Sequence, residues 1–132
     1  MKEIDKIALI EIQDQKILST RSKGKDTFYL PGGKREGNET DTETLIREIK
    51  EELNVDIEEK SIEYIGTFKA QSHGRAEGII VKMTCYKASY KNTPKASSEI
   101  EEIKWLTSND MDIISEVDKK IFSFLKEQHK II

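Results

Sequence analysis

Three glutamates at helical spacing are the residues of this sequence best suited to chemistry. Glu48, Glu51 and Glu52 stand at i, i+3 and i+4, so a helix places their carboxylates in one stripe. Like charges at this spacing destabilise an isolated helix, whereas carboxylate oxygens are ligands that Mg²⁺ and Mn²⁺ prefer. The stripe therefore predicts a divalent metal site. For these glutamates alone, a solvated acidic face is the alternative.

A pair of glycines lies upstream of the stripe. The segment 29–33, with the sequence YLPGG, ends a short extended stretch. Glycine adopts backbone angles that other residues resist, so Gly32 and Gly33 can form a loop whose carbonyl oxygens turn inward. We expect this loop to shape the mouth of the site, and a simple tight turn is the alternative.

The helix that carries the stripe has clear ends in the sequence. Thr40 and Glu43 form a Thr-x-x-Glu capping box, which predicts that the helix begins near Asp41. We expect it to end at Asn54, because a β-branched pattern resumes there and asparagine is the usual second choice to glycine for a left-handed residue after a helix. The apolar face consists of Leu45, Ile46, Ile49 and Leu53. The glutamates therefore lie beside the buried face, at the rim of the domain.

The remaining elements must position this helix. Alternating apolar patterns predict strands over residues 6–12, 16–20, 61–70, 78–88 and 101–106, the first two forming a hairpin around the polar turn 13–15. Apolar residues at helical spacing predict a second amphipathic helix over 115–129. Strands, a helix, more strands and a closing helix predict an α+β fold, an α/β/α sandwich with a mixed sheet flanked by helices. We expect one domain, residues 1–132.

Composition limits the classes of function. A chain of 132 residues, 36% hydrophobic and 36% charged, can bury one core, and no apolar run approaches the roughly 20 residues of a membrane span. The N-terminus does not resemble a secretory signal, so we expect a cytoplasmic protein that does not bind membranes. The net charge of −3 argues against stable nucleic-acid binding. The single cysteine, Cys85, cannot form an internal disulfide and is interpreted as a strand residue.

The residues around the stripe resemble the signature of the Nudix hydrolases. That signature is a glycine, five residues, a glutamate, seven residues, Arg-Glu, an aliphatic residue, any residue, Glu-Glu, any residue, a glycine and an aliphatic residue. The matching residues are Gly33, Glu39, Arg47, Glu48, Ile49, Glu51, Glu52 and Val55. Only Asn54 departs, since it stands where the signature has its last glycine, and asparagine can adopt the same backbone conformation.

The resemblance implies hydrolysis of a diphosphate bond in a nucleoside diphosphate derivative, with Mg²⁺ or Mn²⁺ and an attacking water. On the matching positions, Glu51 and Glu52 are the expected main metal ligands, and Glu48 is either a ligand or the general base. Gly32 is expected to offer its carbonyl to the metal. Arg47 is an expected catalytic residue that orients a carboxylate, for which Glu39 is the candidate, through a bidentate contact.

Outside the signature, the expected substrate-binding and catalytic residues have open alternatives. Glu99 is the preferred further catalytic carboxylate, with Glu102 next and a plain charged loop as the alternative. Trp105 could stack on a nucleobase or belong to the core. In the loop that follows residue 70, His73 and Arg75 could reach a phosphate or ribose, or form a polar hairpin. The expected substrate-binding residues are Gly33, Lys34, Glu39, Arg75 and Trp105.

Signature and fold do not specify the substrate, because specificity depends on loops and strand faces outside the signature. The preferred reading is a nucleoside triphosphate pyrophosphohydrolase that acts as a monomer or homodimer on a small-molecule nucleotide. The alternatives are an ADP-ribose or nucleotide-sugar pyrophosphatase, a dinucleoside polyphosphate hydrolase, and a non-catalytic nucleotide-sensing module of the same fold. A purely structural acidic domain is a further alternative, which the glycine loop disfavours.

Overall fold

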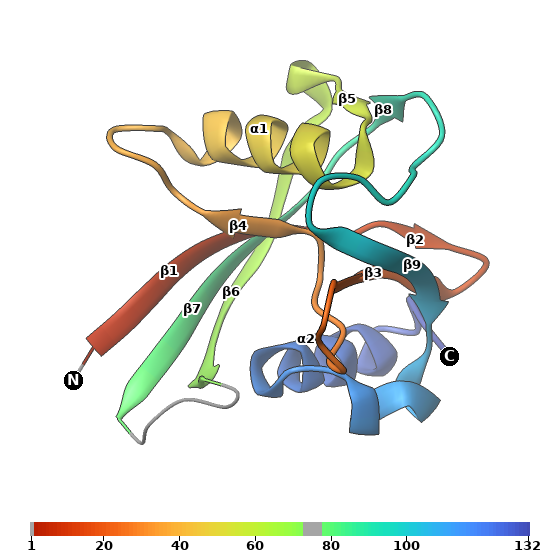
Figure 1. The fold of residues 1–132 in the computed structure, drawn as a ribbon. Helices are drawn as coiled ribbons and strands as arrows, with labels where there is room; N and C mark the ends of the chain where they lie inside the picture. The colour runs from red at the N-terminus through yellow and green to blue at the C-terminus, as the bar shows by residue number, and fades with distance from the viewer. Residues whose placement is uncertain (1, 73–77) are drawn as a thin grey trace.

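A mixed four-stranded sheet lies at the centre of the molecule (Figure 1). The computed structural model describes residues 2–72 and 78–132. The strand order is β4-β1-β7-β6, in which β1 and β7 run parallel and the other neighbours are antiparallel. The bounds are β1 Lys2–Leu9, β4 Gly32–Lys34, β6 Glu63–Gln71 and β7 Ile79–Lys87.

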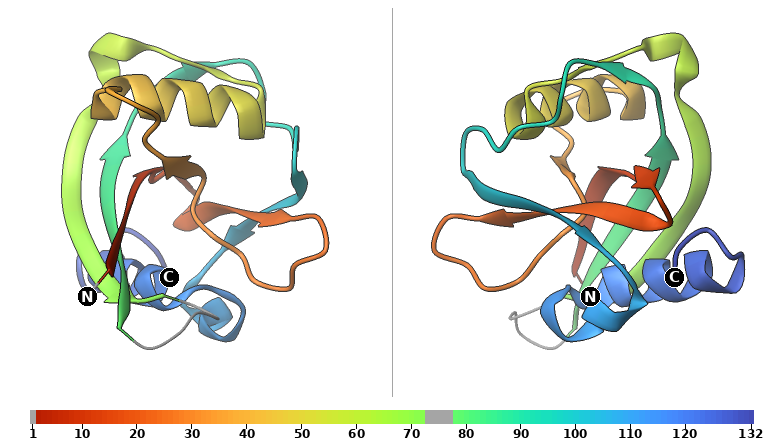
Figure 2. Two further views of the ribbon diagram at one scale, coloured as in Figure 1. Left: turned by 60° about the vertical axis from the view of Figure 1, so that its left-hand side comes forward. Right: turned by 90° about the vertical axis from the view of Figure 1, so that its right-hand side faces the viewer.

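A second sheet lies beside the first and has the order β2-β3-β9 (Figure 2). Its bounds are β2 Ile12–Gln13, β3 Lys16–Ser22 and β9 Ile100–Leu106. The short strands β5 Asp56–Ile57 and β8 Tyr90–Lys91 form a separate antiparallel pair. Two 3₁₀ helices, η1 Glu59–Ser61 and η2 Ser108–Ile113, complete the connections.

The two helices cover opposite faces of the central sheet, α1 Asp41–Leu53 on one side and α2 Glu116–Glu127 on the other (Figure 1). Strand β1 contributes to both cores because its side chains alternate between the faces. Ile7 and Leu9 pack in the cluster that contains the apolar residues of α1, while Ile4 and Ala8 pack in the cluster that contains those of α2. The predicted α/β/α sandwich is confirmed.

The predicted first hairpin is wrong in part. Strand β1 ends at Leu9 and pairs with β4 and β7, so only β2 forms the hairpin with β3. The residues from Ile7 to Ile10 are buried without a break, and a strand covered on both faces gives no periodic signal for its end or its partner. The turn itself is confirmed: Asp14 and Gln15 both have positive φ, as a two-residue hairpin turn requires.

The other long elements lie within a few residues of their predicted bounds. Strands β6, β7 and β9 and helix α2 correspond to the predicted segments, and Cys85 is buried in β7 as interpreted. Strands of only two or three residues were not predicted. One of them is β4, in which the two glycines form part of a strand rather than a free loop. Within residues 2–72 and 78–132, no helix is long and apolar enough to span a membrane.

Both ends of α1 lie where the sequence predicts. The Thr40 hydroxyl accepts from the Glu43 N–H at 3.1 Å, and the Glu43 carboxylate accepts from the Thr40 N–H at 2.9 Å, so the capping box is complete. Asn54 has φ 55° and ψ 38°, the left-handed conformation, and its N–H donates to the Lys50 carbonyl. The departure from the signature therefore keeps the backbone geometry that a glycine would supply.

The left-handed conformation of Asn54 predicts the effect of two substitutions. Asn54→Val should lower the free energy of unfolding by roughly 1–2 kcal/mol, because a β-branched side chain resists this conformation. Asn54→Gly should be neutral or slightly stabilising. Denaturant melts of both variants measure the difference, and equal stability of the two would contradict the role given to this helix end.

Candidate active site

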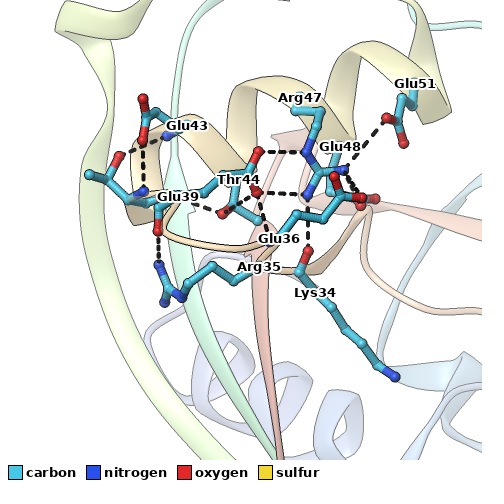
Figure 3. Close-up of polar contacts among 10 residues, drawn as sticks. Lys34, Arg35, Glu36, Glu39, Glu43, Thr44, Arg47, Glu48 and Glu51 are labelled. Atoms are coloured by element: carbon cyan, nitrogen blue, oxygen red, sulfur yellow. Dashed lines mark hydrogen bonds and ion pairs between the residues drawn. The ribbon is translucent and has the colours of Figure 1, made fainter.

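The Arg47 guanidinium connects the segments that form the site (Figure 3). Its Nε donates to Glu39 Oε2 at 2.7 Å and its Nη2 to Glu39 Oε1 at 2.9 Å. The bidentate contact between Arg47 and Glu39 is therefore confirmed. Arg47 also donates to Glu48 Oε1 at 2.8 Å and to the Lys34 carbonyl at 3.0 Å. One side chain thus joins helix α1, strand β4 and the loop between them.

Glu39 supports this arrangement from the loop. Besides the contacts with Arg47, its carboxylate accepts from the Glu36 N–H at 2.9 Å and from the Thr44 hydroxyl at 3.1 Å. Hydrogen bonding to Arg47 and to the Glu36 backbone lowers the pKa of Glu39 from 4.5 to about 2. Its oxygens are engaged within the protein, so the structure shows Glu39 as a support for Arg47.

Close approach to backbone requires glycine at position 32, and Gly33 lies directly against the Glu48 carboxylate. A Cβ on Gly32 would lie 2.0 Å from the Ile7 carbonyl oxygen, and the φ of Gly32, +146°, is one that L side chains rarely adopt. A Cβ on Gly33 would lie 2.4 Å from Glu48 Oε2. The Gly32 N–H donates to Glu52 Oε1 at 3.0 Å. Glycine therefore lets β4 pass directly beneath the carboxylates of α1.

Glu48, Glu52 and Glu99 line one cavity of about 340 Å³, which we name the carboxylate cavity. Burial raises the pKa of Glu52 to about 8, the Gly32 N–H opposes that shift, and the charges of Glu48 and Glu99 add to it. Burial also raises the pKa of Glu48, while hydrogen bonding to Arg47 opposes the rise. The cavity therefore gathers carboxyl groups whose ionised forms a cation would stabilise.

Backbone hydrogen bonds bring Glu99 to this cavity. The Ser97 N–H donates to the Glu52 carbonyl at 3.0 Å, and the Lys95 N–H donates to the Leu53 carbonyl at 2.9 Å. These carbonyls belong to the last turn of α1, where no later N–H group of the helix can donate to them. From the other side, the Lys23 N–H donates to the Glu99 carbonyl at 2.9 Å. The loop before β9 is thus fixed to the helix that carries Glu52.

Two other predicted acidic residues lie outside the carboxylate cavity. The side chain of Glu51 is 51% exposed, and its carboxylate lies 3.5 Å from Arg47 Nη1. Glu102 forms an ion pair with Arg21 Nε at 3.2 Å. Of the two alternatives, the structure therefore brings Glu99, which precedes β9, and not Glu102, which lies within β9, to Glu48 and Glu52.

The predicted substrate-binding residues are divided between several places. Lys34 lines the carboxylate cavity, and its side chain extends away from the Arg47 network (Figure 3). Gly33 lines the same cavity. Trp105 lies on a separate cavity of about 420 Å³ with Tyr90 and packs against the core cluster beneath α1. Arg75, with His73, lies outside the described residues.

A larger cavity of about 660 Å³ adjoins the carboxylate cavity, and we name it the large cavity. Both cavities share part of their walls, so one elongated ligand could occupy them together. The shared residues are Lys6, Ser22, Tyr29, Lys34 and Met83. Of these, only Lys34 was named from the sequence. The available signal for Lys6 was a cation between Ile4 and Ala8 on an otherwise apolar strand face.

Asp118 is another residue that sequence reasoning missed. It is fully buried near the start of α2, and its Oδ2 accepts from the Leu30 N–H at 2.9 Å. Burial raises its pKa to about 7. Its Oδ1 has no hydrogen-bond partner within the described part of the chain. Asp118 ties the residue just before Pro31 and Gly32 to the second helix, so both helices fix the glycine strand.

The donor chemistry of the carboxylate cavity fits a hard divalent cation. Three carboxylates face one space, and burial with mutual repulsion raises the pKa of Glu52. Mg²⁺ and Mn²⁺ accept such oxygen ligands. Among residues 2–72 and 78–132, however, no three His, Cys, Asp or Glu side chains already converge closely enough to hold a metal ion.

The fold places an acidic helix beside a strand that contains two glycines, and comparison with known proteins identifies the family. A family model described as NUDIX domain matches residues 4–127, so the chain belongs to the Nudix family. The protein is a Nudix hydrolase, of a family that acts on small nucleotide substrates and generally uses divalent metals. A search of curated proteins found no match.

Solved structures support the same fold. The ORF135 protein of E. coli is 24% identical, with a TM-score of 0.71 and coverage of 96% of this chain and 92% of that one. A putative Nudix hydrolase family member from Chromobacterium violaceum is 25% identical, with a TM-score of 0.72 and coverage of 96% and 78%. The MutT protein from Methanosarcina mazei is 17% identical, with a TM-score of 0.73 and coverage of 98% and 96%.

The lowered pKa of Glu39 predicts how a substitution depends on pH. The ionised carboxylate stabilises the fold above its unfolded pKa, and this contribution is lost as pH falls from about 4.5 through about 2. Glu39→Gln should therefore destabilise the protein near neutral pH, by an amount that shrinks across this range. Urea melts at several pH values measure it, with the exposed Glu58→Gln as control. A constant difference at every pH would contradict the assignment.

Proposed function

We propose that the protein hydrolyses a nucleoside triphosphate to the monophosphate and pyrophosphate, with Mg²⁺ or Mn²⁺ as cofactor. The observation that carries the proposal is the shared wall between the carboxylate cavity and the large cavity. Three carboxylates suit a metal-bound polyphosphate, and about 660 Å³ lies in the range of small-molecule sites, roughly 300–1,000 Å³. A nucleotide has both parts in one molecule.

In this proposal, Glu48 and Glu52, with the Gly32 carbonyl, hold the cation, and Glu51, which lies outside the carboxylate cavity in this structure, joins them as a further ligand. A bound divalent cation polarises phosphoryl oxygens and lowers the pKa of a coordinated water. Arg47 holds the Glu48 carboxylate in place, as their 2.8 Å hydrogen bond supports. Glu99 or Glu48 accepts the proton of the attacking water, since both face the same space.

A panel of nucleotides tests the proposal and separates it from its alternatives. The purified protein with Mg²⁺ is incubated with the common nucleoside triphosphates, ADP-ribose, nucleotide sugars and dinucleoside polyphosphates, and the products are resolved by chromatography. Release of pyrophosphate and a monophosphate from a triphosphate is expected. Exclusive turnover of ADP-ribose or a nucleotide sugar would overturn the substrate class. Binding of a nucleotide without turnover would favour the sensing module.

The proposed metal role of Glu52 gives a direct prediction. Glu52→Gln keeps size and shape but removes a ligand charge, so kcat should fall by about two orders of magnitude or more. The fold should remain, because the Gln oxygen can still accept from the Gly32 N–H. Steady-state kinetics and thermal melts measure both effects, with the exposed Glu58→Gln as control. A rate near that of the wild type would exclude Glu52 as an essential ligand.

A paired substitution tests the role of Glu99. Glu99→Gln should lower kcat by roughly 10²-fold, in the range of general-base effects, while KM changes little because the loss falls on the transition state. Glu102→Gln is the matched control, since Glu102 pairs with Arg21. Kinetics of both variants decide between them. Slower turnover in the Glu102 variant alone would reverse the assignment.

A further inference from the structure

Two lysines stand side by side on the wall that the carboxylate cavity and the large cavity share. Lys6 of β1 and Lys34 of β4 are direct partners in the antiparallel register. Directly opposed residues project to the same face with Cβ atoms about 5 Å apart, and like charges there destabilise a sheet. Both lysines line both cavities. The pair therefore suggests a negatively charged ligand at the junction.

The Lys6 ammonium lies beside an aromatic ring. Its Nζ lies 5.4 Å from the centroid of the Tyr29 ring, and Tyr29 also lines both cavities. Lys6 lines the carboxylate cavity together with Glu52, and it lines the large cavity together with Ser115, the residue that caps the start of α2. The ammonium is thus within electrostatic reach of the carboxylate cavity and of the start of α2.

The surroundings of Lys6 make a purely structural lysine costly. Its neighbours on the same face of β1, Ile4 and Ala8, are buried in the apolar core on the α2 side. Met83 of β7 is the register partner of Lys6 in the central sheet, and Met83 belongs to the same core. The charge of a lysine in such surroundings is costly unless nearby groups compensate it, and the Tyr29 ring supplies part of that compensation.

We propose that Lys6 makes the site prefer nucleoside phosphates to nucleosides. It does so by binding the phosphate attached to the nucleoside, with Lys34 on the other side of the same phosphate. This inference rests on the proposed function. With the hydrolysed anhydride at the carboxylates and the nucleoside in the large cavity, the group that crosses the shared wall is the nucleoside phosphate. An ammonium is a common phosphate ligand and acts as a point charge.

Equilibrium binding tests Lys6 without relying on turnover. The wild type, Lys6→Met and Lys82→Met are titrated in Mg²⁺ buffer with AMP, GMP, CMP and UMP and with the four corresponding nucleosides. Lys82 is the matched control, because it lies on β7 with its side chain on the opposite face of the sheet, near Asp41. Methionine replaces the long side chain of lysine without charge, and thermal melts report whether each variant is folded.

The expected result is specific to the phosphate. The wild type should bind at least one monophosphate more tightly than its nucleoside. Lys6→Met should weaken that monophosphate by about 10-fold or more, the scale of one charged hydrogen bond, and leave the nucleoside within about 2-fold. Lys82→Met should change neither affinity.

Other results overturn the inference in distinguishable ways. Unchanged monophosphate binding by folded Lys6→Met would remove Lys6 from the site. Equal losses for nucleoside and monophosphate would assign Lys6 to the base or ribose and overturn the phosphate contact. A wild type that neither binds these compounds nor hydrolyses any nucleotide in the panel would overturn the proposed function itself, and with it this inference.

Discussion

The bidentate ion pair between Arg47 and Glu39 is the constraint on which the rest of the site depends. It fixes the loop before α1 against the second turn of the helix, and it leaves the guanidinium free to reach Glu48 and the Lys34 carbonyl as well. The end of β4, the course of the loop and the place of one carboxylate thus follow from one planar group. A lysine could not make these contacts, because its ammonium lacks the planar fork of donors.

The far end of α1 is held by different chemistry. Its last carbonyls have no helical partners, and the N–H groups of Lys95 and Ser97 satisfy those of Leu53 and Glu52. The same hydrogen bonds place Glu99 beside Glu52. Hydrogen bonds of backbone groups that would otherwise be unsatisfied therefore offset the repulsion between the carboxylates of Glu52 and Glu99. Asp118 completes the frame by holding Leu30, so the glycine strand is fixed to both helices.

Features that depend on residues close in sequence could be predicted. The capping box, the left-handed Asn54 and the pairing of Arg47 with Glu39 all belong to one loop and helix, where spacing determines geometry. The partners of β1 could not be predicted, because both faces of a buried strand are apolar and its sequence does not indicate which strands pair with it. Lys6 and Asp118 were missed for a related reason, since only the tertiary fold brings β1 and α2 to the glycine strand.

The charges around the two cavities explain why the missed residues matter. Glu48, Glu52 and Glu99 gather on one side, and Lys6 and Lys34 oppose each other on the shared wall. Without a ligand, each set of like charges lowers the stability of the protein. Functional sites often reduce stability in this way. A cation compensates only the carboxylates, and a free phosphate compensates only the lysines. Under the proposed function, a metal-bound nucleotide would carry both charges in one ligand and would compensate both sets.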